Sequence, residues 1–253
     1  MTDTDFAIEV HGLSRRFADF IAIKDVTLKV RRGHIHALIG PNGAGKTTFF
    51  NLLTKTLDPS AGTILYKGRN ITRMAPAQVA QMGMVRSFQI SAIFSTLTVL
   101  DNVRVALQRA HGTSFHFWRS VKELDSLNER ADALLQDVGL ADKADVTAGD
   151  LSYGRKRALE IATTLALDPE LLLLDEPTSG MGLEDVAHAA ALIRRVARTR
   201  TVLMVEHNLG VVADLADRIT VLASGTVLTE GTYAEVASDP RVQAAYIGRE
   251  FKA

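Results

Sequence analysis

The sequence predicts an α/β fold, in which a core sheet carries an N-terminal antiparallel β part and an inserted helical subdomain. Three observations predict it. Short bursts of alternating apolar and polar residues occur early in the chain, as in half-buried strands. Apolar residues then recur at three- and four-residue steps, as in amphipathic helices. Beyond residue 170, strand-like and helix-like segments alternate, which is typical of an α/β sheet.

The early segments 7–13, 21–30 and 62–68 are expected to form antiparallel strands, because glycines and the turn residues 31–33 separate them. The apolar run 35–40 is different. It ends in a glycine loop and is followed by an amphipathic stretch, so it predicts a buried strand that leads into a helix over 46–57.

The middle of the chain is expected to be a helical subdomain over about 90–166, with helices at 99–110 and 124–140. After it, Leu171–Leu174 are apolar on both faces, as in a central parallel strand. The remaining predicted elements are a helix at 185–199, a strand at 201–207, a helix at 209–217, a strand at 218–225 and a terminal helical tail over about 238–253. All belong to one predicted domain, 1–253.

Composition limits the classes of function. Lys+Arg and Asp+Glu both number 29 among 253 residues, which argues against a general affinity for nucleic acid or anionic lipid. The chain has no cysteine, so thiolate chemistry is excluded. No apolar run approaches the roughly 18–20 residues needed to span a bilayer, so another chain is expected to bring this one to a membrane.

Residues 40–48 satisfy the pattern G-x-x-x-x-G-K-[ST] between the predicted strand and helix. Glycines let the backbone N–H groups face phosphate oxygens, and the helix adds the positive end of its dipole. Lys46 is expected to reach the β- and γ-phosphates of ATP, and the Thr47 hydroxyl to bind Mg²⁺. The predicted nucleotide-binding residues are Gly40, Pro41, Asn42, Gly43, Ala44, Gly45, Lys46, Thr47 and Thr48.

Asp175 and Glu176 follow the Leu171–Leu174 strand, at the sheet edge where ligands gather. Asp175 suits water-mediated contact with Mg²⁺, and Glu176 suits orienting or deprotonating the attacking water. The alternative is an acidic helix N-terminus with Pro177 in its first turn. The phosphate loop in the same domain favours the functional interpretation.

Two further side chains end predicted strands. His207 is expected to hydrogen-bond the γ-phosphate or the attacking water, although a lone histidine is more often packed or solvated. Gln89 ends a short apolar run, and its amide can bind Mg²⁺ and respond to the γ-phosphate. The residues alone leave the role of Gln89 open.

Ser152, Tyr153 and Gly154 precede a predicted helix that runs to Asp168. A simple serine cap is one interpretation. The other is a second phosphate cradle. Because this loop belongs to the helical insertion, one chain cannot easily bring it to its own ATP, whereas two chains related by a two-fold axis can each offer it to the other's ATP.

The ordered set of the phosphate loop, Gln89, the Leu-Ser-Tyr-Gly loop, the Leu-rich strand with its acids, and His207 resembles the ATP-binding subunit of ABC transporters, over almost the whole chain. The resemblance implies a P-loop NTPase core sheet, and a helical subdomain that touches transmembrane permease subunits. It implies that Ser152, Tyr153 and Gly154 bind the partner protomer's ATP. It also places Phe17 where an aromatic stacks on adenine, with a core phenylalanine as the alternative.

Finer features resemble the ATPases of branched-chain amino-acid importers: "GMVRSFQ", the "SFHFWRS" insertion and the ending "AAYIG". Three residues depart from the usual family pattern. In the signature, Tyr153 stands where glycine is usual, as is frequent in this subgroup, and Arg155 stands where glutamine is usual. Gly182 stands where aspartate is common, which fits a heterodimer with a sister ATPase.

The expected function is therefore an ATPase that powers a transporter at the cytoplasmic face of a membrane, with ATP and Mg²⁺ as cofactors. Its expected partners are a second ATPase subunit in a homo- or heterodimer, permease subunits and, indirectly, a solute-binding protein, but no nucleic acid. Transport of urea or amides, lipopolysaccharide export, and work on a soluble scaffold are the alternatives.

Overall fold

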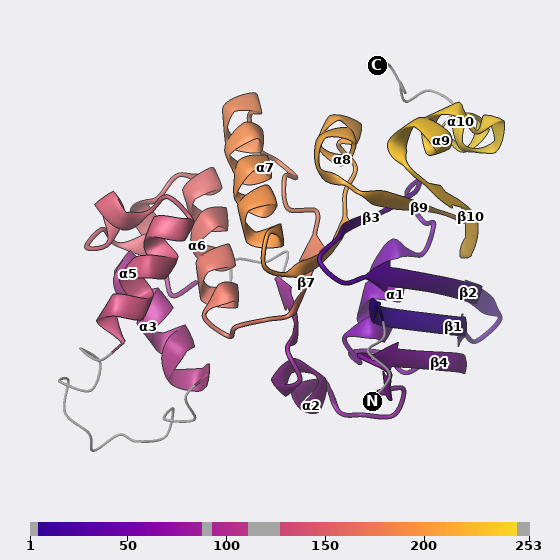
Figure 1. Ribbon diagram of the computed structural model, residues 1–253, viewed down its shortest axis with the longest axis horizontal. Coiled ribbons are helices and arrows are strands. Elements are labelled where there is room, and N and C mark those ends of the chain that lie inside the picture. The colour runs from indigo at the N-terminus through magenta and orange to yellow at the C-terminus, as the bar shows by residue number, and fades with distance from the viewer. Residues whose placement is uncertain (1–4, 88–92, 111–126, 247–253) are drawn as a thin grey trace.

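Two sheets and a group of helices build the computed structural model, which describes residues 5–87, 93–110 and 127–246 (Figure 1). The antiparallel strands lie at one end of the molecule and the helical subdomain at the other. The predicted α/β class is confirmed.

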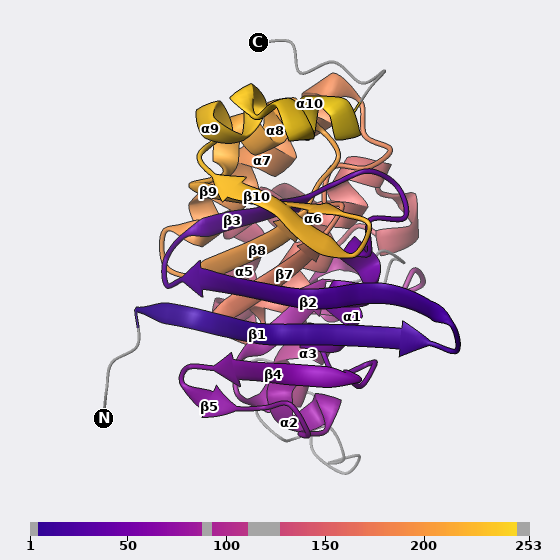
Figure 2. The same cartoon turned by 90° about the vertical axis from the view of Figure 1, so that its right-hand side faces the viewer.

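The predicted N-terminal strands form a four-stranded antiparallel sheet in the order β2-β1-β4-β5. Its members are β1 (Phe6–Phe17), β2 (Phe20–Arg31), β4 (Ala61–Tyr66) and β5 (Arg69–Asn70). Figure 2 shows β1 between β2 and β4. Apolar and polar residues alternate along β2, so one face of the strand is buried: Val26, Leu28 and Val30 are buried, while the residues between them are exposed.

The core sheet has six strands in the order β10-β9-β3-β8-β7-β6. They are β3 (Ile35–Ile39), β6 (Met84–Ser87), β7 (Leu171–Asp175), β8 (Thr201–Val205), β9 (Arg218–Ala223) and β10 (Thr226–Gly231). The pairs from β6 to β9 are parallel, and only β10 pairs antiparallel. The carboxyl ends of β3, β7 and β8 therefore meet at one edge of the sheet.

The core strands are apolar on both faces because each face closes a different hydrophobic core. In β7, Leu171 and Leu173 pack with the antiparallel sheet and helix α1 (Lys46–Leu53). Leu172 and Leu174 pack on the opposite side, with other helices. The helices that contribute to this second core include α7 (Leu183–Ala197), α8 (Leu209–Leu215), α9 (Tyr233–Ser238) and α10 (Pro240–Ala245). Helix α2 (Pro76–Gln81) contacts β6 and buries Val79 in the first core.

The predicted helical subdomain contains α3 (Val99–Ala110), α5 (Asn128–Asp137) and α6 (Tyr153–Leu165), with short 3-10 turns at 141–143 and 148–150. Figure 1 shows these three helices packed side by side, and α6 also contacts β6 and α7. The subdomain is thus joined to the core sheet through α6.

Some predicted boundaries were wrong. The helix expected over 46–57 ends at Leu53, because Lys55 adopts a left-handed backbone with φ 61°. The helix expected over 124–140 ends at Asp137, before Gly139 with φ 73°, and its expected first residues lie outside the described part. In the described residues, no helix is both long and apolar enough to cross a bilayer.

Candidate nucleotide-binding and catalytic site

In the loop between β3 and α1, two glycines lie too close to neighbouring backbone to allow a side chain. Gly45 has φ 102°, and a Cβ there would lie 2.7 Å from the Ala22 carbonyl oxygen. A Cβ on Gly40 would lie only 2.2 Å from the Leu222 carbonyl oxygen. The loop therefore lies directly against the backbone of its own chain at both glycines.

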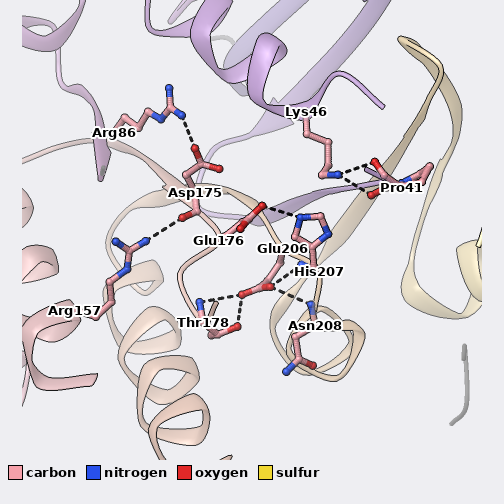
Figure 3. A network of polar contacts seen from close by, with 11 residues as sticks. Pro41, Lys46, Arg86, Arg157, Asp175, Glu176, Thr178, Glu206, His207 and Asn208 are labelled. Atoms are coloured by element: carbon pink, nitrogen blue, oxygen red, sulfur yellow. Dashed lines mark hydrogen bonds and ion pairs between the residues drawn. The ribbon is translucent and has the colours of Figure 1, made fainter. Parts of the chain in front are cut away.

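Lys46 closes this loop from inside. Its Nζ donates to the carbonyl oxygens of Gly40 at 2.7 Å and Pro41 at 3.0 Å, and the residue is buried (Figure 3). The first turn of α1 has no acidic residue, and its first N–H groups have no partners within the helix. Thr47 is exposed beside them. The remaining predicted residues take these positions: Asn42 and Gly43 exposed, Pro41 and Thr48 half-buried, and Ala44 buried. The loop thus combines an ammonium group with a helix N-terminus, an arrangement that favours anions.

Asp175 lies at the end of β7 and is almost fully buried. Its carboxylate forms an ion pair with Arg86 of β6, and its carbonyl oxygen accepts from Arg157 Nη2 of α6 at 2.9 Å (Figure 3). Arg86 Nη1 also donates to Asn51 Oδ1 of α1 at 2.6 Å. Asp175 is therefore held by β6 and α6, at the same sheet edge as the phosphate loop.

Glu176 and His207 meet at this edge. His207 Nε2 lies 2.7 Å from Glu176 Oε1, although the two residues are 31 positions apart (Figure 3). Glu176 has φ 48° and donates its N–H to the Val205 carbonyl oxygen at 2.9 Å. A left-handed backbone at a non-glycine residue costs of order 1–3 kcal/mol and is typical of functional sites. In this conformation the Glu176 carboxylate faces the histidine.

Phe17 and Gln89 have different outcomes. Phe17 ends β1 with 39% of its surface exposed, and the Arg15 guanidinium carbon lies 4.6 Å from its ring centroid. The core alternative for Phe17 was therefore wrong, while its stacking on adenine stays a prediction. Gln89 lies outside the described residues.

The Leu-Ser-Tyr-Gly loop leads into α6; its Ser152 and Tyr153 are exposed, whereas Leu151 is buried. Ser152 has the backbone of an N-cap, yet within the described residues its exposed hydroxyl makes no capping hydrogen bond. Tyr153 is 54% exposed, and its hydroxyl donates to the Ser179 carbonyl oxygen at 3.2 Å. Gly154 lies against the Asp185 side chain. The simple capping interpretation was therefore wrong, because the serine side chain does not cap.

The electrostatics of this helix start are unusual. The first two turns of α6 contain Arg155, Lys156 and Arg157, and the first turn contains no acidic residue. Cations at the positive end of a helix dipole are unfavourable unless an anion lies nearby. Asp185 supplies one such anion beside Gly154. In the described part of the chain, none of the hydrogen bonds and ion pairs of Ser152, Tyr153 and Gly154 reaches the phosphate loop.

Sequence reasoning missed three residues of this edge: Arg86, Arg157 and Glu206. Glu206 is buried and accepts hydrogen bonds from two loops. A signal was present for two of them, because Arg86 interrupts an apolar strand and Glu206 ends one. Their partners lie 89 and 28 positions away, and no local pattern identifies such partners.

Comparisons with known proteins agree with this geometry. The model of the family described as ABC transporter matches residues 23–179, and that described as branched-chain amino acid ATP-binding cassette transporter matches residues 226–252. The chain is 37% identical over 251 residues to the high-affinity branched-chain amino acid transport ATP-binding protein LivG of Salmonella typhimurium, covering 95% of this chain and 97% of the relative. The protein BraF of Pseudomonas aeruginosa, which has the same description, gives the same identity and coverage.

Solved structures agree as well. An ATP-binding cassette of an ABC transporter in its ADP conformation has a TM-score of 0.86 and 27% identity, covering 97% of this chain and all of that one. A nucleotide-free cassette has a TM-score of 0.84 and 26% identity, covering 96% of this chain and all of that one. Since the family match, the near full-length relatives and the phosphate-loop geometry all agree, this chain belongs to the ABC transporter family, among its ATP-binding subunits.

Proposed function

We propose that this chain hydrolyses ATP to power the import of branched-chain or related amino acids. The relatives named for branched-chain amino acid transport support the solute class, because they align over 95% of the chain. The C-terminal family match to residues 226–252 supports the same class. The geometry of the sheet edge supports the reaction.

The phosphate loop would hold the nucleotide. Lys46 would exchange its two loop carbonyl oxygens for phosphate oxygens, and the first N–H groups of α1 would donate to the same anion. The described residues also fit Mg²⁺, because the Thr47 hydroxyl is exposed and offers a hard oxygen ligand, and the Asp175 carboxylate at the same sheet edge suits a water-mediated contact. The Gln89 amide stays a predicted ligand outside the described residues. When bound, Mg²⁺ would neutralise part of the negative charge of the phosphates.

The contact between Glu176 and His207 carries the proposal. Phosphoryl transfer to water needs a positioned nucleophile, and a carboxylate held by a histidine can orient water and accept its proton. His207 is also expected to hydrogen-bond the γ-phosphate. Glu176 is half-buried, so it is shielded yet open to a ligand.

A second copy or a sister ATPase would complete the site. Ser152 and Tyr153 are exposed at a helix start whose first turn contains Arg155 and Lys156 and no acid, whereas Arg157 is buried and already paired with Glu160. The γ-phosphate of the partner's ATP would add a second anion to that of Asp185. Each of two chains related by a two-fold axis would then close the other's site, and hydrolysis would release the pair.

The helical subdomain would contact the permease subunits at the cytoplasmic face of the membrane. Phe94 supports this role because it lies shortly before α3 in the chain and 54% of its surface is exposed. Asn102 holds its backbone on both sides, accepting from Phe94 N at 2.7 Å and donating to Phe94 O at 3.1 Å. An apolar side chain presented on a fixed backbone suits an amphipathic helix of a membrane subunit.

The first test is Glu176→Gln. It should lower kcat for ATP hydrolysis by at least about 100-fold, the range for losing a general base, while ATP still binds and traps a dimer. Phosphate release and size-exclusion chromatography with ATP measure the two effects. Glu170→Gln is the matched control, because Glu170 pairs with Lys67 outside this site. Full activity of Glu176→Gln would remove Glu176 from its role.

The second test concerns the partners. Affinity purification of the chain from its native membranes should recover polytopic permease subunits, and proteoliposomes with those subunits and a binding protein should take up labelled leucine. Recovery of soluble partners alone would contradict the transport function and favour a soluble scaffold. Uptake of urea, but not leucine, would reassign the solute.

A further inference from the structure

Glu206 joins the two loops that carry the proposed reaction. It is the residue after β8, and only 2% of its surface is exposed. Its Oε1 accepts from Thr178 N at 3.1 Å and from the Thr178 hydroxyl. Its Oε2 accepts from His207 N at 2.6 Å and from Asn208 N at 3.0 Å (Figure 3). One oxygen therefore holds the loop after β7, and the other holds the loop after β8.

The four donors explain how a buried carboxylate is tolerated. Three are backbone N–H groups and one is a hydroxyl, and each hydrogen bond to a charged acceptor is stronger than a neutral one. Among the described residues, no cation pairs with Glu206. Within the part of the chain that the structure describes, the carboxylate is therefore stabilised by groups of the two loops themselves, so its position and the geometry of the loops depend on each other.

The same loops carry Glu176 and His207. Thr178 lies two residues after Glu176, and it is almost fully buried. His207 donates its own backbone N–H to Glu206. The 2.7 Å contact between Glu176 and His207 thus joins the same two loops as the hydrogen bonds of Glu206 and lies next to them.

We infer that Glu206 is a positioning residue for ATP hydrolysis: its carboxylate holds Thr178 against His207 and Asn208, and so fixes Glu176 relative to His207. The inference rests on the proposed ATPase. Glu206 makes no hydrogen bond or ion pair to the phosphate loop in the described part of the chain, so its effect belongs to turnover and not to ATP binding.

Glu206→Gln is the sharpest variant, because it keeps the shape and removes one acceptor. Each carboxylate oxygen accepts from at least one backbone N–H, so the new NH₂ group must face a donor. We expect kcat to fall by about 10–100-fold, since a small misplacement of reacting groups costs up to 10²-fold. The KM for ATP should stay within about twofold, because ground-state binding is untouched.

Thr178 supplies a milder matched pair. Thr178→Ser keeps both donors to Glu206 and should stay within about twofold of wild-type kcat, whereas Thr178→Val loses the hydroxyl and should lower kcat by about 3–10-fold. This pair decides the question if Glu206→Gln does not fold. A merely structural role would lower the melting temperature and leave kcat per folded molecule unchanged.

A double-mutant cycle tests whether Glu206 affects kcat through the contact between Glu176 and His207. In a His207→Ala background, Glu206→Gln should change the residual kcat by less than about threefold, because the contact that it positions is already lost. Equal fold losses in both backgrounds would overturn the inference, as would wild-type kcat in Glu206→Gln. An active wild type with an inactive Glu176→Gln and an unaffected Glu206→Gln would overturn this inference alone. Wild-type protein without ATP hydrolysis would overturn the proposed function too.

Discussion

Two helix N-termini, those of α1 and α6, share a missing acid in the first turn but differ in what surrounds them. The loop before α1 is walled by its own chain, where added Cβ atoms on Gly40 and Gly45 would meet backbone oxygens. The loop before α6 is exposed, and Ser152 leaves it uncapped among the described residues. In the part of the chain that the structure describes, neither N-terminus has a side-chain cap, so the difference lies in the surrounding backbone: it encloses the loop before α1, whereas Ser152 and Tyr153 at the start of α6 are exposed, as the proposed contact with a partner's ATP requires.

The most severe way to break this comparison is Ser152→Arg. If the α6 loop completes a partner's site, hydrolysis should fall by at least about 100-fold, as when preorganised donors to a developing charge are lost. ATP affinity of the isolated chain should stay within about twofold, because the loop makes no hydrogen bond or ion pair to residues 40–48 in the described part. Phosphate release and a fluorescent ATP analogue measure the two quantities.

The control for that variant is Ser238→Arg, which places the same side chain on the exposed end of α9. It should leave both quantities unchanged. Normal turnover of Ser152→Arg would mean that α6 is not part of any nucleotide site.

Lys46→Ala tests the phosphate loop before α1. The ammonium group is buried and its loop carbonyl partners can be replaced by phosphates, so its loss should remove charged hydrogen bonds worth about 1.5–3 kcal/mol. ATP should then bind about 10–100-fold more weakly to the isolated chain, as measured by calorimetry. Lys143→Ala, in the helical subdomain, is the control. An unchanged affinity would contradict a cradle closed by one chain.

A pair of glycine variants sharpens the difference in rigidity. Gly45→Ala forces a side chain into a left-handed backbone facing the Ala22 carbonyl, and should lower the free energy of unfolding by about 2 kcal/mol or more. Gly154→Ala displaces only the Asp185 side chain, and helix propensity favours alanine by about 1 kcal/mol, so its loss should be under about 1 kcal/mol. Urea unfolding compares them. Equal losses would show that the α6 loop is as tightly walled as the α1 loop.

The smallest effect concerns Phe17. Base stacking on an aromatic ring contributes about 1–3 kcal/mol, so Phe17→Ala should weaken ATP binding by about 5–20-fold at the lower part of that range, while Phe17→Trp should retain it. Phe20→Ala is a matched control, because Phe20 is 64% exposed on the adjacent strand β2. Equal losses from both alanine variants would assign the effect to the strand pairing and not to adenine.

The sequence determined the fold class and the phosphate loop, because both depend on short-range patterns. Strand β3, residues 40–45 and helix α1 are contiguous, and their glycines are required by backbone geometry that the spacing already implies. The alternation in β2 and the two-sided apolar run of β7 likewise follow from period alone.

Only the tertiary structure decided which side chains meet at the sheet edge. Arg86 reaches Asp175 across 89 positions, His207 reaches Glu176 across 31, and Glu206 reaches Thr178 across 28. Parallel strands bring together residues separated by long crossovers, so no local spacing encodes those contacts. The tertiary structure also decided that Ser152 is exposed and does not cap α6, because the packing of the surrounding chain determines whether a serine before a helix caps it.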